Sequence, residues 1–223
     1  MRRVGLLVVV GCLLASSVIA TPRDDLGSPS QQVRDAAAAS LRTHYVPPPR
    51  SRWEPVLAAL RPGDSKDNVL QTLQPYAVTM EGSMGGGGSH TELYRLDDSW
   101  LLRCDYGRSN ELFRSELMRT VRQVWVAPAA DFTGTWTTYF VNGQRSHEIH
   151  YRNGQYFGIY TMFHANGFKA VVQHHGTQGV EGEEFGYFPS GAVAYRGQYD
   201  KGAQVGTWVW YNEDGSVQST QEH

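Results

Sequence analysis

The sequence predicts an α+β protein, with short N-terminal helices and a small antiparallel meander followed by an all-β sheet of repeated hairpins. Glycine and aromatic residues recur every 24 residues in the C-terminal part, which indicates a repeat architecture. Capping signals and prolines bound short helical stretches nearer the N-terminus. The composition, with 24 Gly, 12 Tyr and 6 Trp, favours turns and aromatic strands over long helices.

Length and charge narrow the function classes. A chain of 223 residues is long enough for one large domain or two small ones. Its formal net charge is -2, and it becomes more negative if the segment that holds Arg2 and Arg3 is removed. Nucleic-acid binding proteins usually carry a positive face, and membrane-surface proteins often carry a polybasic run. The sequence therefore predicts no nucleic-acid partner.

Residues 1–20 have the pattern of a signal peptide. A positive leader precedes an apolar run that ends in small or branched residues, so cleavage is expected after Ala20. The run is just short of a comfortable membrane span, which leaves an uncleaved anchor as an alternative. Cys12 lies in a loose lipoprotein box, but apolar residues follow it. We expect an exported protein, periplasmic or secreted, with no transmembrane segment after cleavage and with lipidation at Cys12 as the less favoured alternative.

Residues 21–50 are predicted to form one helix and a proline-rich linker. The run Ser28-Pro29-Ser30-Gln31 has the form of a capping box with Ser28 as the N-cap. An apolar stripe follows at Val33, Ala37 and Leu41. The helix should end before Pro47, because three consecutive prolines force an extended chain.

Residues 51–128 are predicted to form a small α+β domain. A second capping box at residues 51–54 should open a short helix that runs to Leu60, and Pro62-Gly63 should form a turn. Asp64 or Ser65 should cap a third helix that ends at Pro75. Its inward residues are expected to be Val69, Leu70 and Leu73.

Strands should follow this helix. The glycine-rich stretch 82–88 lacks the order of a phosphate-binding loop and is expected to be a flexible hairpin loop. Strands are expected at 93–96, 100–106 and 113–118, with alternating apolar residues on the second one. Cys104 lies on that apolar face, and packing is its simplest role. As the single cysteine of the mature chain, it could form neither an internal disulfide nor a thiolate metal site.

Two stretches of this region resemble a known envelope domain. They are the run from Leu60 to Leu70, which contains Pro62-Gly63-Asp64-Ser65-Lys66, and the run from Tyr94 to Trp100. Over residues 53–120 the chain resembles the BamE-like, or SmpA/OmlA-like, domain. That family helps to organise outer-membrane assembly. The glycine-rich insertion departs from its pattern, which puts in doubt any partner surface carried on that loop.

Residues 129–223 contain four repeats of 24 residues. Each opens on a glycine, continues through aromatic positions and closes on a second glycine; the opening residues are Gly134, Gly158, Gly182 and Gly206. Asn142-Gly143 and its equivalents are expected to form type I′ turns, and Asn153-Gly154 and its equivalents the return turns. Since one hairpin cannot bury its aromatic residues alone, the units should stack into an antiparallel meander.

The repeat core Gly-x-Trp-x-x-Tyr-x-x-x-Gly, together with Tyr151-x-Asn153-Gly154 between units, resembles a known repeat family. Over residues 132–220 the chain resembles MORN-type repeats, in the variant found in YwqK-family antitoxins. The resemblance implies a binding platform for protein or lipid. The antitoxin function itself transfers poorly to an exported chain.

Catalysis and metal binding are not expected. His150 and His174 lie one repeat apart, which is about 9.6 Å across two strands and too far for one ion to bridge. Glu181, Glu183 and Glu184 cluster, but an acidic loop on a degenerate repeat explains them. The sequence contains no catalytic motif of the hydrolase, thiol or nucleotide-binding kinds. We therefore predict a non-enzyme with no metal and no cofactor.

The candidate binding residues are the aromatic positions of the repeat. They form two columns three residues apart, which strict alternation places on opposite faces: Trp136, Tyr160 and Trp208 in one, and Tyr139, Phe163, Tyr187 and Tyr211 in the other. Core packing is the favoured role, and one column could still face solvent.

The predicted function is a non-catalytic interaction or scaffold protein of the bacterial envelope. A carbohydrate- or peptidoglycan-binding module that uses an exposed aromatic ladder is the alternative. The expected partner is an envelope protein or a glycan.

Overall fold

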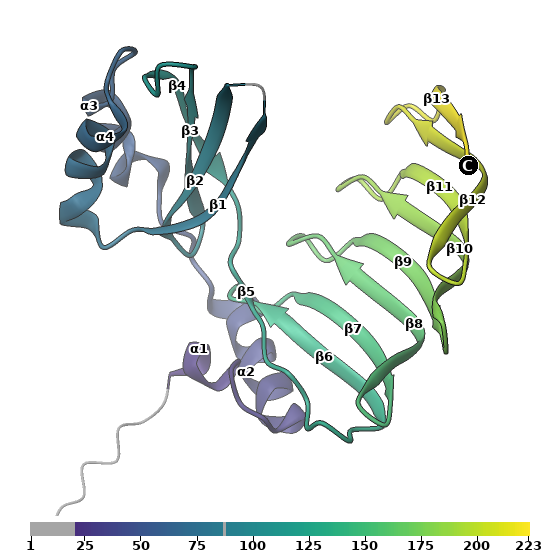
Figure 1. Cartoon of the computed structure of the whole chain (residues 1–223). Coiled ribbons are helices and arrows are strands. Elements are labelled where there is room, and N and C mark those ends of the chain that lie inside the picture. The colour runs from purple at the N-terminus through teal and green to yellow at the C-terminus, as the bar shows by residue number, and fades with distance from the viewer. Residues whose placement is uncertain (1–20, 87) are drawn as a thin grey trace, which may run out of the picture.

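The computed structural model describes residues 21–86 and 88–223, so the expected signal peptide and Cys12 lie outside the described residues. Two antiparallel sheets carry the fold, and short helices flank them (Figure 1). The predicted α+β class is therefore confirmed. No helix among the described residues is long and apolar enough to cross a membrane.

Two helices precede the first sheet, α1 (Pro22–Asp25) and α2 (Gln31–His44). The expected cap at Ser28 is wrong, because Ser30 is the N-cap of α2 and the Ser28 hydroxyl accepts from the backbone N–H of Ser30. The expected stripe is also rotated. Val33 is exposed, whereas Arg34 and Ala38 are buried beside Ala37 and Leu41. A 3.6-residue period places residues 34, 37, 38 and 41 on one face, and a strict spacing of four drifts away from it.

The first sheet is four-stranded, in the order β1 (Thr79–Gly86), β2 (Ser89–Asp97), β3 (Trp100–Tyr106) and β4 (Leu112–Arg119). Residues 82–88 were expected to form a flexible hairpin loop, and this was wrong for residues 82–86, which belong to β1. They pair along β2, with one register shift between Met80 and Gly82. Backbone pairing needs no apolar side chains, which is why a glycine-rich strand escapes a periodicity search.

Two short α-helices, α3 (Glu54–Ala59) and α4 (Lys66–Leu73), pack on this sheet, with 3-10 turns η1 (Arg50–Arg52) and η2 (Gln74–Tyr76) beside them. Ser65 caps α4 by accepting from Asn68, as expected. The N-cap of α3 is Trp53, so the capping box expected at Ser51 does not form. Leu70 was expected inward and is exposed instead.

Cys104 is fully buried in the core between α3, α4 and the sheet. Leu102 and Tyr106 flank it on the same face, as alternation predicts. Burial raises the pKa of its thiol to about 12. The thiol therefore packs as an apolar group.

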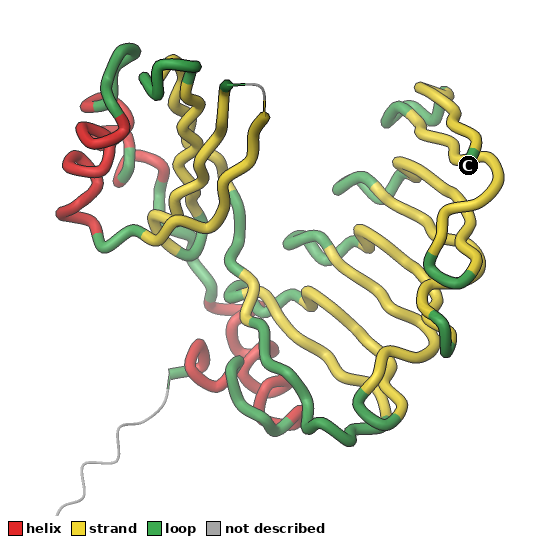
Figure 2. Tube along the Cα trace, viewed as in Figure 1, coloured by secondary structure: helices red, strands yellow, loops and turns green. Residues whose placement is uncertain are grey.

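The second sheet has nine strands in sequential antiparallel order from β5 to β13 (Figure 2). The strands are β5 (Gln123–Val124), β6 (Gly134–Phe140), β7 (Arg145–Arg152), β8 (Gln155–Phe163), β9 (Lys169–Gly176), β10 (Gly179–Tyr187), β11 (Val193–Asp200), β12 (Ala203–Tyr211) and β13 (Val217–Glu222). The predicted hairpin meander is therefore confirmed. Its hairpins follow one another in a curved row from β6 to β13 (Figure 1).

The turns that close each repeat differ from expectation. Gly143 has φ of 80°, but φ is not positive at Asn142, so this turn is not type I′. Phe140 accepts from the N–H of Gly143 and donates to the carbonyl of Gln144, which defines a three-residue loop with a left-handed glycine. The return turn at Asn153-Gly154 has positive φ at both residues and is type I′.

The opening glycine of the repeat marks a bulge. Gly158 has φ of 86° and lies where the pairing of β7 with β8 shifts, between the partners of Ile149 and Tyr151. Gly182 and Gly206 lie in equivalent shifts. A bulge bends its strand, so the recurring glycine bends β8, β10 and β12 at equivalent points, whereas Gly134 of the first repeat pairs regularly with Tyr151.

Helix α2 covers the exposed edge of β6, the first long strand of this sheet. The backbone N–H of Thr137 donates to the side chain of Gln31 (3.0 Å), and the Thr137 carbonyl accepts from Nε of Arg34 (3.2 Å). Side chains thus take the place of a neighbouring strand. An open sheet edge would otherwise leave these groups unpaired.

Candidate functional site

The repeat sheet has two faces, which we name after their first aromatic residues. Cross-strand partners lie on the same face. The Trp136 face carries Trp136, Ile149, Tyr160 and Gln173 and, further along, Glu184, Gly197 and Trp208. The Tyr139 face carries Tyr139, Arg145, Phe163, Lys169, Tyr187, Val193, Tyr211 and Val217. The two predicted columns therefore lie on opposite faces.

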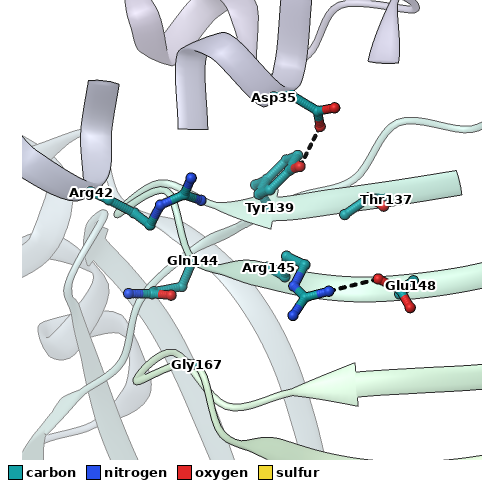
Figure 3. Close-up of a pocket in the computed structure, with 8 residues that line it drawn as sticks. All are labelled: Asp35, Arg42, Thr137, Tyr139, Gln144, Arg145, Glu148 and Gly167. Carbon is teal, nitrogen blue, oxygen red and sulfur yellow. Dashed lines mark hydrogen bonds and ion pairs between the residues drawn. The ribbon is translucent and has the colours of Figure 1, made fainter. Parts of the chain in front are cut away.

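Tyr139 is buried under α2, where its hydroxyl donates to Asp35. A polar pocket of about 530 Å³ opens beside it, between α2 and the first two hairpins (Figure 3). Arg42 lines this pocket and donates to the carbonyl of Gly143 at 2.8 Å. Arg145 donates to Glu148 at 2.7 Å (Figure 3). The charged side chains of the pocket thus have partners within the chain.

The rest of the Tyr139 row is progressively less covered. Phe163 is buried, and the guanidinium of Arg145 lies 4.7 Å from its ring centre. Tyr187 and Tyr211 are half-buried. Phe185 stacks beside Tyr187 with ring centres 6.4 Å apart. The open part of this row therefore lies in the last two repeats.

On the Trp136 face, the first repeat is covered by the chain itself. The indole N–H of Trp136 donates to the carbonyl of Val126 at 2.8 Å, and the Phe132 ring packs edge-on at 5.2 Å. The guanidinium of Arg34 lies 3.8 Å from the Trp136 ring centre. Sequence reasoning did not find Arg34, although its place on the buried side of a periodic helix is a signal that could have done so.

The third and fourth repeats carry a different cluster on the same face. Glu184 stands where the other repeats have Trp136, Tyr160 and Trp208, and it is only 7% exposed. Tyr195 donates to it at 2.8 Å. Burial raises the pKa of Glu184, and the Tyr195 hydrogen bond offsets part of that rise.

Trp208 is 2% exposed and packs against rings from its own and neighbouring strands. Tyr199 meets it edge-on at 5.2 Å, and Tyr195 lies nearly parallel at 6.0 Å. The Trp208 ring lies over Gly197, where an added Cβ would overlap it. The indole N–H of Trp208 is enclosed and has no hydrogen-bond partner in the described chain.

The seven predicted site residues therefore fall into two groups. Those that are buried are Trp136, Tyr139, Phe163 and Trp208, and those that are half-buried are Tyr160, Tyr187 and Tyr211. Neither column forms a continuous exposed ladder.

An apolar groove of about 830 Å³ runs along the turn edge of the repeats. Tyr45 and Pro47 of the linker line one part of the groove. Val121, from the segment that joins β4 to β5, lines it as well. Phe140 and Met162 form the repeat side. Sequence reasoning did not find this groove because it joins segments far apart in the chain.

The small domain contains a buried polar network. Glu92 accepts from Lys66 and from Tyr94, and His90 lies 3.8 Å from its carboxylate. Burial alone would raise the pKa of Glu92, but the hydrogen bonds from Lys66 and Tyr94 hold it below its ordinary value. The described residues contain no group of three or more His, Cys, Asp or Glu side chains placed to hold a metal ion.

The last hairpin of the chain is similar to a known repeat family. Residues 204–223 match the MORN repeat variant family. No curated protein and no solved structure matches the chain. The match covers β12 and β13, so the MORN-like repeat predicted from the glycine and aromatic spacing is supported there.

Proposed function

We propose that this protein is a non-catalytic interaction protein of the bacterial cell envelope that uses its repeat sheet as a binding platform. The observation that carries the proposal is the contrast along the sheet. The first repeat is covered by α2 and by residues 126 and 132, whereas Tyr187 and Tyr211 of the later repeats remain half-exposed. Partly exposed aromatic rings on a regular sheet are typical of a surface that a partner covers.

The envelope assignment rests on the sequence. It follows from the leader and the apolar run of residues 1–20 and from the resemblance of residues 53–120 to the BamE-like domain. We further propose that the repeats belong to the variant found in YwqK-family proteins. Export predicts a mature chain that begins at Thr21. Intact-mass measurement of protein from the envelope fraction tests this, and a lipid-modified start at Cys12 would replace it with a lipoprotein.

The glycan-binding alternative requires exposed rings, and the structure limits it. Trp136 and Trp208 are buried, which leaves no continuous ladder for a polysaccharide to follow. We therefore favour a protein partner.

Site-specific photocrosslinking in cells tests the platform. A photoreactive residue at Tyr187 should yield a crosslinked protein adduct, because this ring lies on the open part of the sheet. The matched control is the same residue at Leu70, an exposed apolar position of α4 in the small domain. Adducts at Leu70 alone would place binding elsewhere. Saturable retention of the purified protein on peptidoglycan, without protein adducts, would favour the glycan reading.

A further inference from the structure

The first repeat shows how this chain covers its own Trp136 face. A guanidinium group, from Arg34, lies on the indole ring, and a peptide carbonyl, from Val126, accepts from the indole N–H. The covering material is thus an arginine side chain together with extended polypeptide.

The third and fourth repeats carry acidic and aromatic groups on the same face, and among the described residues no arginine of this chain lies over them. Glu184 is a buried carboxylate in a row of aromatic rings, and no Lys, Arg or His side chain pairs with it among the described residues. Removing a carboxylate from water costs several kcal/mol unless a cation or several donors compensate, and Tyr195 supplies a single donor. Nearby, the Trp208 indole N–H has no acceptor, in contrast to that of Trp136.

The C-terminal end of the repeat sheet, from residue 179 onward, is acidic. From residue 179 onward the sequence has seven carboxylate side chains and only two cations, Arg196 and Lys201. Within the described chain, the arginine groups that lie over repeat-sheet rings cover Trp136, Phe157 and Phe163. The aromatic rings beyond Phe163 have no such partner among the described residues. The acidic, aromatic end is therefore complementary to a basic polypeptide.

We propose that the Trp136 face of the third and fourth repeats binds an arginine-bearing segment of a partner polypeptide. The guanidinium pairs with the Glu184 carboxylate and lies against the half-buried Tyr195 ring, as Arg34 lies on Trp136. Guanidinium groups suit this site because they combine carboxylate pairing with stacking on rings. This inference rests on the proposed platform function and places a partner segment on the face opposite to Tyr187 and Tyr211.

The test uses the mature chain and an acetylated, amidated tetra-arginine peptide, with tetra-citrulline as an uncharged isostere. Titration is followed by the indole N–H resonance of Trp208 in NMR spectra, assigned with Trp208→Phe. We expect saturable shifts of this resonance with tetra-arginine, weakening as salt rises, and none with tetra-citrulline. The indole resonance of Trp53, in the core of the small domain, should not move.

Glu184→Gln keeps an acceptor for Tyr195 and removes the charge. It should weaken binding of tetra-arginine by roughly tenfold or more, as loss of one charge-assisted hydrogen bond predicts. The matched control is Glu148→Gln, which removes a carboxylate of the Tyr139 face that pairs with Arg145 and should leave the affinity unchanged. Thermal unfolding confirms that both variants are folded.

Three results would overturn the proposal: equal binding by Glu184→Gln and wild type, equal binding of tetra-citrulline, or shifts confined to other indoles. These are separable from failure of the platform. If adducts at Tyr187 persist while Glu184→Gln binds tetra-arginine like wild type, the platform stands and the arginine site does not. If no adduct forms at Tyr187 but tetra-arginine binds and Glu184→Gln weakens that binding, the arginine site stands and the Tyr187 surface does not contact the partner.

Discussion

Arg34→Ala should loosen α2 from the repeat sheet, because this side chain contacts both Thr137 and Trp136 of β6. Arg34 is fully buried and donates to three acceptors, the carbonyls of Thr137 and Ser28 and the side chain of Gln31. It also covers the Trp136 ring at 3.8 Å. Each hydrogen bond contributes about 1 kcal/mol net, and the ring contact contributes about 1 kcal/mol. The side-chain entropy regained in the variant offsets about 2 kcal/mol, so the lost contacts alone should reduce the unfolding free energy by about 2 kcal/mol. The acceptors left unpaired in a buried site raise the expected loss of unfolding free energy to about 3 kcal/mol.

Urea unfolding followed by tryptophan fluorescence measures the loss. Amide hydrogen exchange locates it, because the Thr137 N–H should lose protection once Gln31 is no longer held in place. The control is Arg152→Ala, whose guanidinium also covers a ring, Phe157, at 3.4 Å but is exposed. It should cost less than about 1 kcal/mol. If Arg34→Ala costs no more than this control and the exchange of Thr137 is unchanged, α2 does not act as the edge cap.

Three further predictions follow from the same packing. Burial raises the pKa of Glu184 above its unfolded value, so the protein loses stability as the pH rises through the folded pKa. Glu184→Gln should therefore stabilise the protein against urea at pH 8 and have little effect at pH 4. A difference in unfolding free energy that does not change with pH would contradict this. Gly197→Ala should reduce the unfolding free energy by about 2 kcal/mol or more, because the new Cβ displaces the Trp208 ring. Gly82→Ala is the control: its Cβ enters open space, and the unfolding free energy should change by less than about 0.5 kcal/mol. Equal shifts in melting temperature for the two variants would refute the packing of Trp208 on Gly197. Cys104→Ala should cost about 1–2 kcal/mol through lost packing, and the native thiol should react with a thiol reagent only at the rate of unfolding; rapid labelling would show that it is accessible.

The repeat architecture could be predicted from the sequence because its determinants are local. Gly158 takes a positive φ at a bulge and Gly143 does so in a turn, and both conformations favour glycine at a fixed distance from its neighbours. Alternation placed Cys104 in the core for the same reason, since the side-chain period of a strand is set by its backbone. The turn type at Asn142 was wrong because Asn-Gly also fits a three-residue loop, in which the asparagine side chain accepts from the backbone N–H of Gln144.

Only the tertiary structure could show which aromatic residues of the repeat sheet are buried by other parts of the chain. The sequence identified the aromatic columns, but whether Trp136 or Tyr187 is covered depends on where α2 and Val126 lie in space. Arg34 is about a hundred residues from the strand edge that it pairs with, and no local pattern encodes such a contact. The sequence predicted that Glu184 lies in an acidic surface loop, because acidic side chains are usually solvated. The period-two pattern of a strand does not show which of its faces is buried. Side-chain burial is a property of the assembled sheet, so the candidate binding surface became visible only once the hairpins were stacked and their first edge was capped.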